Sequence, residues 1–466
     1  MVSIFENNFI KKLNNNWIFE YIMIMLYILF SVLGWLYSYS YAGIGIVSLT
    51  IVLLFIFNDF KYVIPAGLCV IFSYNGGYES STFPIEIACY GGVLIFIILL
   101  YSILNFKKSN FKRPKSYIGI MLLAISCMIP IFWNKIITQE TQLMYFIYFS
   151  WVLYIVVYFV FGINLGKNSL RVVIFTFSAI AVLLFAECFL TVYRFHINNP
   201  DIPLLMSTFS LGWGICNEAG ILFCFCMPFV FYQLVKTKNS IISAICTISV
   251  AMCMAGIVLT TSRGAMLFGG CEFIALCVLM VIFSKKKITN IVFMLLMVAL
   301  GLAFIQIYFG IPEFINDLIY SFKAVKLSDD ERWTHYSDAI SSWNTDWLTR
   351  IFGSGIVSKI ETRWSLGIYD SVFIVYHSTF FETLVMGGIV GILALAFHFF
   401  EKYKQLWKSE KAFFLVMIFG YLFVDLYGMI DNTYGMYYYM VPLVILMASL
   451  DNDKNTDIFN YELIGA

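Results

Sequence analysis

The sequence predicts an all-α polytopic membrane protein with about 12 to 14 transmembrane helices and one large external loop between about residues 310 and 377. Three observations predict this fold class. First, 61% of the 466 residues are hydrophobic and only 12% are charged, whereas a soluble globular protein has roughly 25% charged residues. Second, the hydrophobic residues lie in runs, many of about the 20 residues that a spanning helix needs. Third, lysines gather in every second interval between these runs, which is typical of cytoplasmic loops.

Fourteen apolar runs are the candidate spans, and the second and third are short, which gives the range in their number. In chain order they are residues 17–39, 42–57, 60–73, 86–105, 117–134, 143–161, 171–193, 217–235, 240–260, 265–283, 289–309, 378–400, 412–428 and 435–450. The chain therefore divides into transmembrane helices over 1–309, an external loop with short helices over 310–377, and transmembrane helices with a cytoplasmic C-terminus over 378–466.

The placement of basic residues predicts the orientation of these spans. If the N-terminus is cytoplasmic, most of the 29 lysine and arginine residues, Lys402 among them, fall in the cytoplasmic intervals, as the positive-inside rule requires. Both termini should then be cytoplasmic. The first run, which follows Lys11 and Lys12, has no cleavage site and is predicted to remain as a span. The net charge of +1 excludes a basic surface for nucleic acid.

The external loop is too long to be a simple connection and has the composition of a small folded cap. Residues 331–343 have helical periodicity, and tryptophans alternate with charges of both signs. The eleven cysteines lie almost entirely in apolar runs, so no disulfide framework is implied. Cys224 and Cys226 have no histidine near them in the sequence, and we predict no metal and no other cofactor.

Charged residues within or beside the spans are candidates for function, because each costs a few kcal/mol to insert. These residues are Glu20, Glu187, Glu218, Arg263, Glu272, Glu382 and Asp425, whereas His398 is assigned to the inner membrane surface. A single charged residue within a span is explained equally well by a structural ion pair and by a role in function. On the predicted topology Glu218, Arg263, Glu382 and Asp425 gather in the outer half, beside the external loop, which favours a site there.

Three segments near this outer group carry the residues with the clearest chemistry. Arg263 stands between two apolar runs in LTTSRGAML, where a guanidinium at a helix start would bind an anion. The segment DDERWTHYSDAI offers Arg332 and His335. His377 stands at the mouth of a span with Glu382 just over one turn further on, and it is a candidate general base or an interfacial structural histidine.

The order of these segments resembles the O-antigen polymerase and O-antigen ligase superfamily of bacterial envelope glycosyltransferases. The resemblance covers roughly residues 205 to 395, and the first 200 residues are similar only as a series of spans. It rests on LGWGICNEAGILFCFCMP (211–228), TSRGA (261–265), ERW with FGSGI (within 331–356), and the histidine followed by MGGIVG. One departure is Ser378, since the family often has asparagine directly after the histidine.

The resemblance implies a metal-independent transfer of glycan from undecaprenyl diphosphate to an acceptor, at the outer face of the bacterial inner membrane. By position, Arg263 and Arg332 resemble the family's diphosphate-binding arginines and His377 its catalytic histidine. Two arginines would stabilise the charge that develops on the leaving diphosphate, and a histidine can accept the proton of the acceptor hydroxyl. The implied partners are the lipid-linked oligosaccharide, membrane lipid and a chain-length-regulating protein.

Further residues are candidates for substrate binding. Glu218 and Glu382 belong to the outer group, and Arg194 is either a third anion contact or an interfacial anchor. Aromatic side chains of the loop either stack on sugars or form the core of the cap. These aromatic residues are Trp333, Tyr336, Trp343, Trp347, Trp364 and Tyr369.

Four functions compete for this pattern. We favour a polymerase of O-antigen or capsule repeat units, because the number of spans and the aromatic, alanine-poor composition are typical of such polymerases. A ligase of the same superfamily is the nearest alternative. A lipid-linked oligosaccharide flippase should have short loops and charges along a central cavity, and a secondary transporter should show internal repeats, which we do not find.

Overall fold

The protein is described by a computed structural model that covers residues 8–74, 85–105, 116–133, 141–166, 168–198, 209–308, 332–355, 358–365, 368–434 and 437–452. Eight helices in this part of the chain are long and apolar enough to cross a membrane. They are α3 (Trp17–Leu36), α4 (Tyr39–Phe57), α9 (Ser169–Asn198), α10 (Cys216–Lys236), α11 (Ser240–Leu259), α12 (Arg263–Phe283), α17 (Thr379–Trp407) and α18 (Lys411–Gly428).

Further apolar helices complete the bundle. They are α5 (Val63–Phe72), α6 (Ile85–Asn105), α7 (Tyr117–Met128), α8 (Thr141–Asn164), α13 (Lys287–Tyr308) and α19 (Tyr437–Asn452). The short helix α2 (Asn8–Asn14) precedes them, and short 3-10 turns at Phe60–Tyr62 and Ile129–Phe132 adjoin α5 and α7. The predicted fold class, an all-α polytopic membrane protein, is confirmed. Almost every predicted apolar run corresponds to one helix, because a backbone in lipid must satisfy its own hydrogen bonds.

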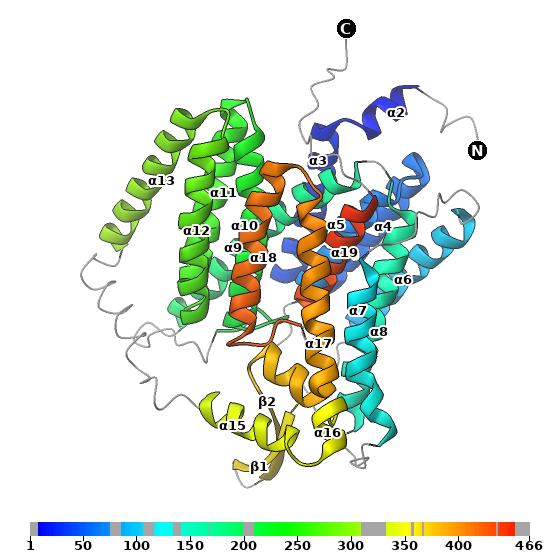
Figure 1. The fold of residues 1–466 in the computed structure, drawn as a ribbon. Helices are drawn as coiled ribbons and strands as arrows, with labels where there is room; N and C mark the ends of the chain where they lie inside the picture. The colour runs from blue at the N-terminus through cyan, green and yellow to red at the C-terminus, as the bar shows by residue number, and fades with distance from the viewer. Residues whose placement is uncertain are drawn as a thin grey trace.

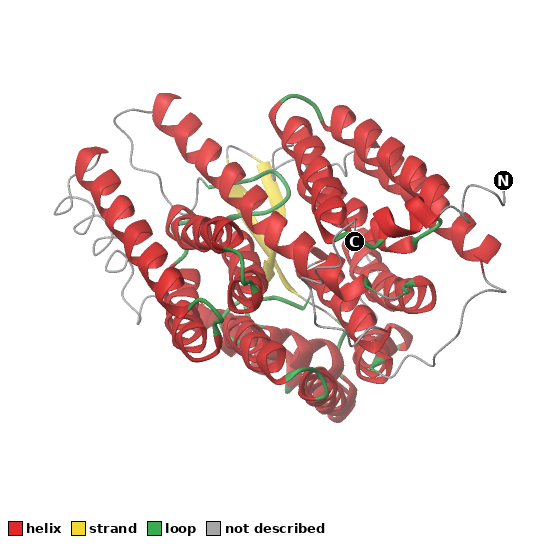
Figure 2. Ribbon diagram, turned by 90° about the horizontal axis from the view of Figure 1, so that it is seen from above, coloured by secondary structure: helices red, strands yellow, loops and turns green. Residues whose placement is uncertain are grey.

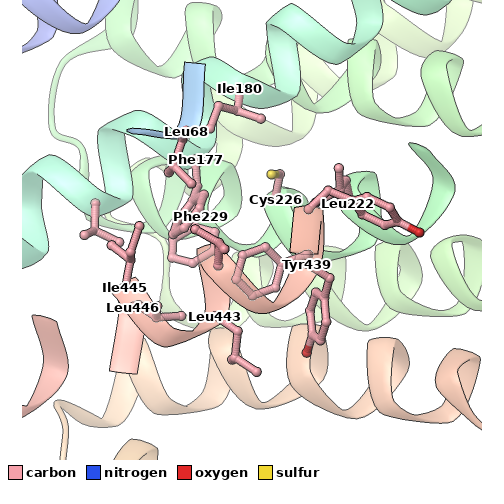
Figure 3. Packing of buried hydrophobic residues seen from close by; sticks show 14 of the residues in the cluster. Leu68, Phe177, Ile180, Leu222, Cys226, Phe229, Tyr439, Leu443, Ile445 and Leu446 are labelled. Atoms are coloured by element: carbon pink, nitrogen blue, oxygen red, sulfur yellow. The ribbon is translucent and has the colours of Figure 1, made fainter. Parts of the chain in front are cut away.

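The helices differ in how much of their surface is available to lipid. The apolar part of α10 is fully buried, whereas only 28% of the corresponding part of α12 is buried. Helix α10 packs against α9, α11, α12 and α18. Figure 3 shows Phe177, Phe229 and Leu443 of α9, α10 and α19 within one hydrophobic cluster. The centre of the bundle is therefore formed by α9, α10 and α19.

The segment predicted to be external forms a cap at one end of the bundle, and α2 lies at the other end (Figure 1). It contains α15 (Arg332–Trp343), α16 (Trp347–Phe352) and an antiparallel hairpin of β1 (Ser358–Ser365) and β2 (Ile368–Val375). In Figure 2 the strands are visible beneath the helices. The predicted helix over 331–343 is confirmed by α15, whereas the strand pair was not predicted.

Helix α17 is broken at Gly388, where φ is 61° and ψ is −154°. A Cβ atom on Gly391 would lie 2.9 Å from the carbonyl oxygen of Thr383, whereas these residues would be about 12 Å apart along a straight helix. The segment before Gly388 therefore folds back against the segment after it. The sequence predicted one continuous span over 378–400, and the fold-back is a difference from that prediction.

The cap docks on this break through two glycine-containing segments. The backbone N–H groups of Ser354 and Gly355 donate to the carbonyl oxygens of Val385 and Met386 at 2.7 and 3.1 Å. A Cβ atom on Gly388 would lie 2.5 Å from the carbonyl carbon of Ile351. The segments FGSGI and MGGIVG, which are far apart in the sequence, thus pack directly against each other.

Some charged side chains within the bundle form buried ion pairs. Near α2, the carboxylate of Glu20 is fully buried and accepts from Lys61 Nζ at 2.8 Å and Arg171 Nε at 2.6 Å. This network supports the end of α2, because Lys61 Nζ and Arg171 Nη2 also donate to the carbonyl oxygens of Asn14 and Asn15, at 2.6 and 3.0 Å. His398 is also fully buried, so its side chain faces the interior of the protein. Its ring packs edge-on against Tyr434 at 5.5 Å inside the protein.

Candidate active site

His377 lies between strand β2 and helix α17 in a left-handed backbone conformation, with φ of 49°. The next residue, Ser378, caps α17 by accepting from the backbone N–H of Phe381 at 3.4 Å. The imidazole is 37% exposed, and its Nδ1 atom is 3.5 Å from Oδ1 of Asp431. A residue that is partly exposed and held in this sparsely populated conformation is a candidate for function.

Asp431 connects His377 to the cap. Its Oδ2 atom is 3.9 Å from Nη2 of Arg332, the first residue of α15. Asp431 is 6% exposed and lies in the buried segment between α18 and α19. Arg332 and His377 were predicted from the sequence, whereas Asp431 was not. One feature of the sequence could have indicated Asp431. It is an acidic residue in GMIDNTYG, an interval between two apolar runs that is predicted to lie on the same side of the membrane as the external loop.

Arg263 is the first residue of α12, as predicted, and it is half-buried. Ser262 caps this helix, and its hydroxyl is 2.6 Å from the hydroxyl of Tyr427. The carbonyl oxygen of Tyr427 in turn accepts from the backbone N–H of Asp431 at 3.0 Å. The start of α12 is thereby tied to the segment that carries Asp431. Among the described residues, no hydrogen bond or ion pair occupies the guanidinium of Arg263.

Glu218 and Glu382 are both buried, at 5% and 4% exposure. Glu218 accepts from the backbone N–H of Ile215 and so caps the start of α10. Glu382 accepts from the side-chain amide of Asn432, the neighbour of Asp431. In the described part of the chain these hydrogen bonds hold neighbouring segments together. A role of Glu218 and Glu382 in substrate binding stays a prediction.

The aromatic residues of the cap fall into two groups. Tyr336 stacks on Phe381 at 4.6 Å, and its hydroxyl donates to the carbonyl oxygen of His377 at 3.4 Å. Trp333 packs edge-on against Tyr336 and remains 59% exposed. Trp343 instead packs into the small core of the cap. Trp333 and Tyr336 therefore lie beside the histidine, where a sugar could stack on the exposed indole.

Other predicted aromatic residues lie outside this group. Trp347 is 68% exposed at the start of α16, and the side chains of Trp364 and Tyr369 fall outside the described structure. His335 is adjacent to the site, since its ring centroid is 5.7 Å from that of His377.

Arg194 stands near the end of α9, with its guanidinium 5.1 Å above the ring of Trp35. It is exposed, and no contact joins it to His377, Arg332 or Asp431 in the described part of the chain. This geometry agrees with the interfacial anchor rather than with the third anion contact.

Asp346 stabilises the short helix of the cap that docks on α17. Its carboxylate accepts from the backbone N–H and the hydroxyl of Thr349, at 2.8 and 3.0 Å. These hydrogen bonds favour the charged form and lower the pKa of Asp346 below its usual value of 3.8.

The fold and these side chains define a polytopic membrane protein with two arginines, a histidine and an aspartate at one end of its bundle. A family model described as O-antigen ligase matches residues 248–396, which is about a third of the chain. The matched segment contains Arg263, Arg332 and His377, but not Asp431. The match supports the O-antigen polymerase and ligase superfamily, whose members are membrane glycosyltransferases. No curated protein and no solved structure matches the chain.

Proposed function

We propose that this protein is a polymerase of cell-surface polysaccharide repeat units, such as O-antigen or capsule. It would transfer the glycan from undecaprenyl diphosphate to a lipid-linked acceptor unit at the outer face of the cytoplasmic membrane. One observation carries the proposal: Asp431 lies 3.5 Å from His377 and 3.9 Å from Arg332. A candidate base and a candidate anion-binding group thus share one carboxylate beside the external cap.

In the proposed reaction, the acceptor hydroxyl oxygen bonds to the anomeric carbon, and the bond from that carbon to the diphosphate oxygen breaks. Arg332 and Arg263 would stabilise the negative charge that collects on the leaving diphosphate. Asp431 would accept a hydrogen bond from Nδ1–H of His377, which leaves Nε2 free to take the hydroxyl proton. No step needs a metal ion, because the guanidinium groups supply the positive charge.

The topology belongs to the same proposal. Both termini would be cytoplasmic, with 1–309 and 378–466 in the membrane and the cap of 310–377 outside. The positive-inside rule supports this orientation. The position of α2 at the end of the bundle opposite the cap also supports it (Figure 1).

A ligase remains the alternative, because the matching family model is described as O-antigen ligase. The two reactions differ in the acceptor. A polymerase needs only lipid-linked repeat units, since they serve as donor and acceptor, whereas a ligase needs a different acceptor for the finished chain.

The test uses the full-length protein in lipid nanodiscs, supplied with lipid-diphosphate-linked repeat units alone. We expect lipid-linked chains of two and more units. His377→Ala, Arg263→Ala and Arg332→Ala should each abolish transfer while the protein remains in the membrane. Arg350→Ala is the matched control, because Arg350 is an exposed arginine of the same cap. If the units stay single until a different acceptor is added, the protein is a ligase; full activity in all three variants would refute the site.

A further inference from the structure

A buried ion pair lies behind the candidate site, between α17 and α18. Lys402 is fully buried, and its Nζ atom is 2.6 and 2.7 Å from the two carboxylate oxygens of Asp425. Lys402 was predicted to lie in a cytoplasmic loop and Asp425 in the outer group, so this pairing was not predicted. Removing two charges from water is unfavourable, and a buried pair often stabilises a fold no better than apolar residues would. The pair therefore needs an explanation other than stability.

Aromatic rings surround the ammonium group of Lys402. Four ring centroids lie 4.8 to 5.6 Å from its Nζ atom. Rings at this distance attract a cation through their electron-rich faces. They belong to Phe399, Tyr403, Tyr421 and Tyr434. Three of these rings come from α17 and α18, whereas Tyr434 comes from the segment that carries Asp431.

Tyr434 joins the ion pair to that segment. Its hydroxyl accepts from Lys402 Nζ at 2.9 Å and donates to Asp425 Oδ1 at 3.3 Å. The preceding residue, Thr433, is held by Thr379, whose hydroxyl oxygen accepts the Thr433 backbone N–H at 3.0 Å. The backbone N–H of Thr379 donates to the carbonyl oxygen of Asp431 at 3.2 Å. Residues 429–434 are thus held by the start of α17 and by a residue near its end.

The fold-back of α17 makes this double attachment possible. Thr379 and Lys402 would lie about 35 Å apart on a straight helix, yet they contact the consecutive residues Thr433 and Tyr434. The break at Gly388 brings both ends of α17 to the same short segment. The segment is therefore fixed from two directions at the point where Asp431 faces His377.

We propose that Lys402 and Asp425 are positioning residues, which act through the hydroxyl of Tyr434 to hold Asp431 against His377 and Arg332. The proposal rests on the proposed transfer function, because it assigns these residues a part in that reaction. The pair contacts neither His377 nor Arg332, so its effect on transfer passes through residues 429–434.

The mildest test removes only the connecting hydroxyl, in Tyr434→Phe. We expect kcat for transfer to fall by about tenfold, which corresponds to one hydrogen bond to a charged group. Tyr421→Phe is the matched control: its ring also lies against Lys402, at 4.8 Å, but its hydroxyl has no hydrogen-bond partner among the described residues. The control should stay within about twofold of the unmodified protein.

A double-mutant cycle separates positioning from general destabilisation. If Tyr434 acts through Asp431, Tyr434→Phe should cause no further loss in an Asp431→Asn background. Additive losses would overturn the proposal, and so would a Tyr434→Phe rate equal to that of Tyr421→Phe. If transfer by Asp431→Asn is too slow to measure, the rate of amide hydrogen exchange over 429–434 replaces the cycle as the test. Tyr434→Phe should raise this rate and Tyr421→Phe should not. An unchanged rate in Tyr434→Phe would overturn the proposal.

The cycle also distinguishes this proposal from the function on which it rests. Loss of transfer in His377→Ala and Asp431→Asn, with full activity in Tyr434→Phe, would overturn only the positioning role. Full activity in His377→Ala and Asp431→Asn would overturn the proposed site and the positioning role together.

Discussion

Replacing Gly388 by alanine is the sharpest test of how the fold presents the candidate site. The backbone there has φ of 61° and ψ of −154°, a region that only glycine adopts without strain. For another residue this conformation costs about 1–3 kcal/mol. A Cβ atom would also meet the backbone of Ile351 at 2.5 Å and the nitrogen of Gly353 at 2.6 Å. These contacts are about 1 Å too short, so α16 would have to move away from α17.

We therefore expect Gly388→Ala to lose roughly 3 kcal/mol or more of stability, as the sum of backbone strain and displaced packing. Transfer should fall at the same time, because the fold-back of α17 places Thr379 against Thr433 and the docked cap carries Arg332. The measurement is thermal unfolding of the full-length protein in nanodiscs, followed by the rate of transfer at a temperature where both proteins are folded.

Gly270→Ala is the control for this experiment. Gly270 lies within the regular helix α12, and a Cβ atom there meets nothing within 4 Å. Alanine should leave transfer unchanged and raise stability slightly, because it is the better helix former. If Gly388→Ala unfolds at the same temperature as Gly270→Ala and transfers glycan at the same rate, our account of the break in α17 is refuted.

The remaining predictions concern single carboxylates. Asp431→Asn should lower transfer by roughly 100-fold, because the amide cannot stabilise a cationic imidazole, and a rate within threefold of normal would remove Asp431 from the site. Glu218→Gln should keep the helix cap and leave transfer within about threefold, whereas a large loss measured in the same assay would indicate contact with substrate. The hydrogen bonds of the Asp346 carboxylate stabilise α16 fully above 3.8, the pKa of this group in the unfolded state. This stabilisation is lost only as the pH falls through the lower pKa of the folded state. Hydrogen exchange in 347–352, corrected for its intrinsic pH dependence, should therefore show constant protection between about pH 5 and 8, and Asp346→Ala should reduce that protection throughout.

The sequence predicted the helices well, because the hydrophobic runs that must span lipid are also the helices of the bundle. It did not predict the fold-back at Gly388, since MGGIVG continues an apolar run and hydropathy does not report backbone direction. The pair of Lys402 and Asp425 was assigned to two different regions for a related reason. A rule based on charge places lysine in a loop, and it cannot detect a partner on another helix.

The candidate site was predicted in part. Arg332 and His377 both lie beside Asp431, and their shared position next to the predicted external loop had suggested that they would be neighbours. Asp431 itself was missed, because it lies in a short interval between spans that looks like an ordinary connection. Only the packing of 429–434 against α17 shows that this interval is buried and faces the histidine.

The place of Asp431 in the chain has a consequence for how the protein matures. Its segment lies between α18 and α19, after every other residue of the candidate site. During synthesis both arginines and the histidine are made before Asp431, and residues 429–434 reach their place only when α18 and α19 pack. A chain that has inserted the helices up to α17 would hold the basic residues without the carboxylate that joins them. The site is therefore completed only after its other residues are in place, and a chain truncated before α18 is expected to be inactive even where its earlier helices are correctly inserted.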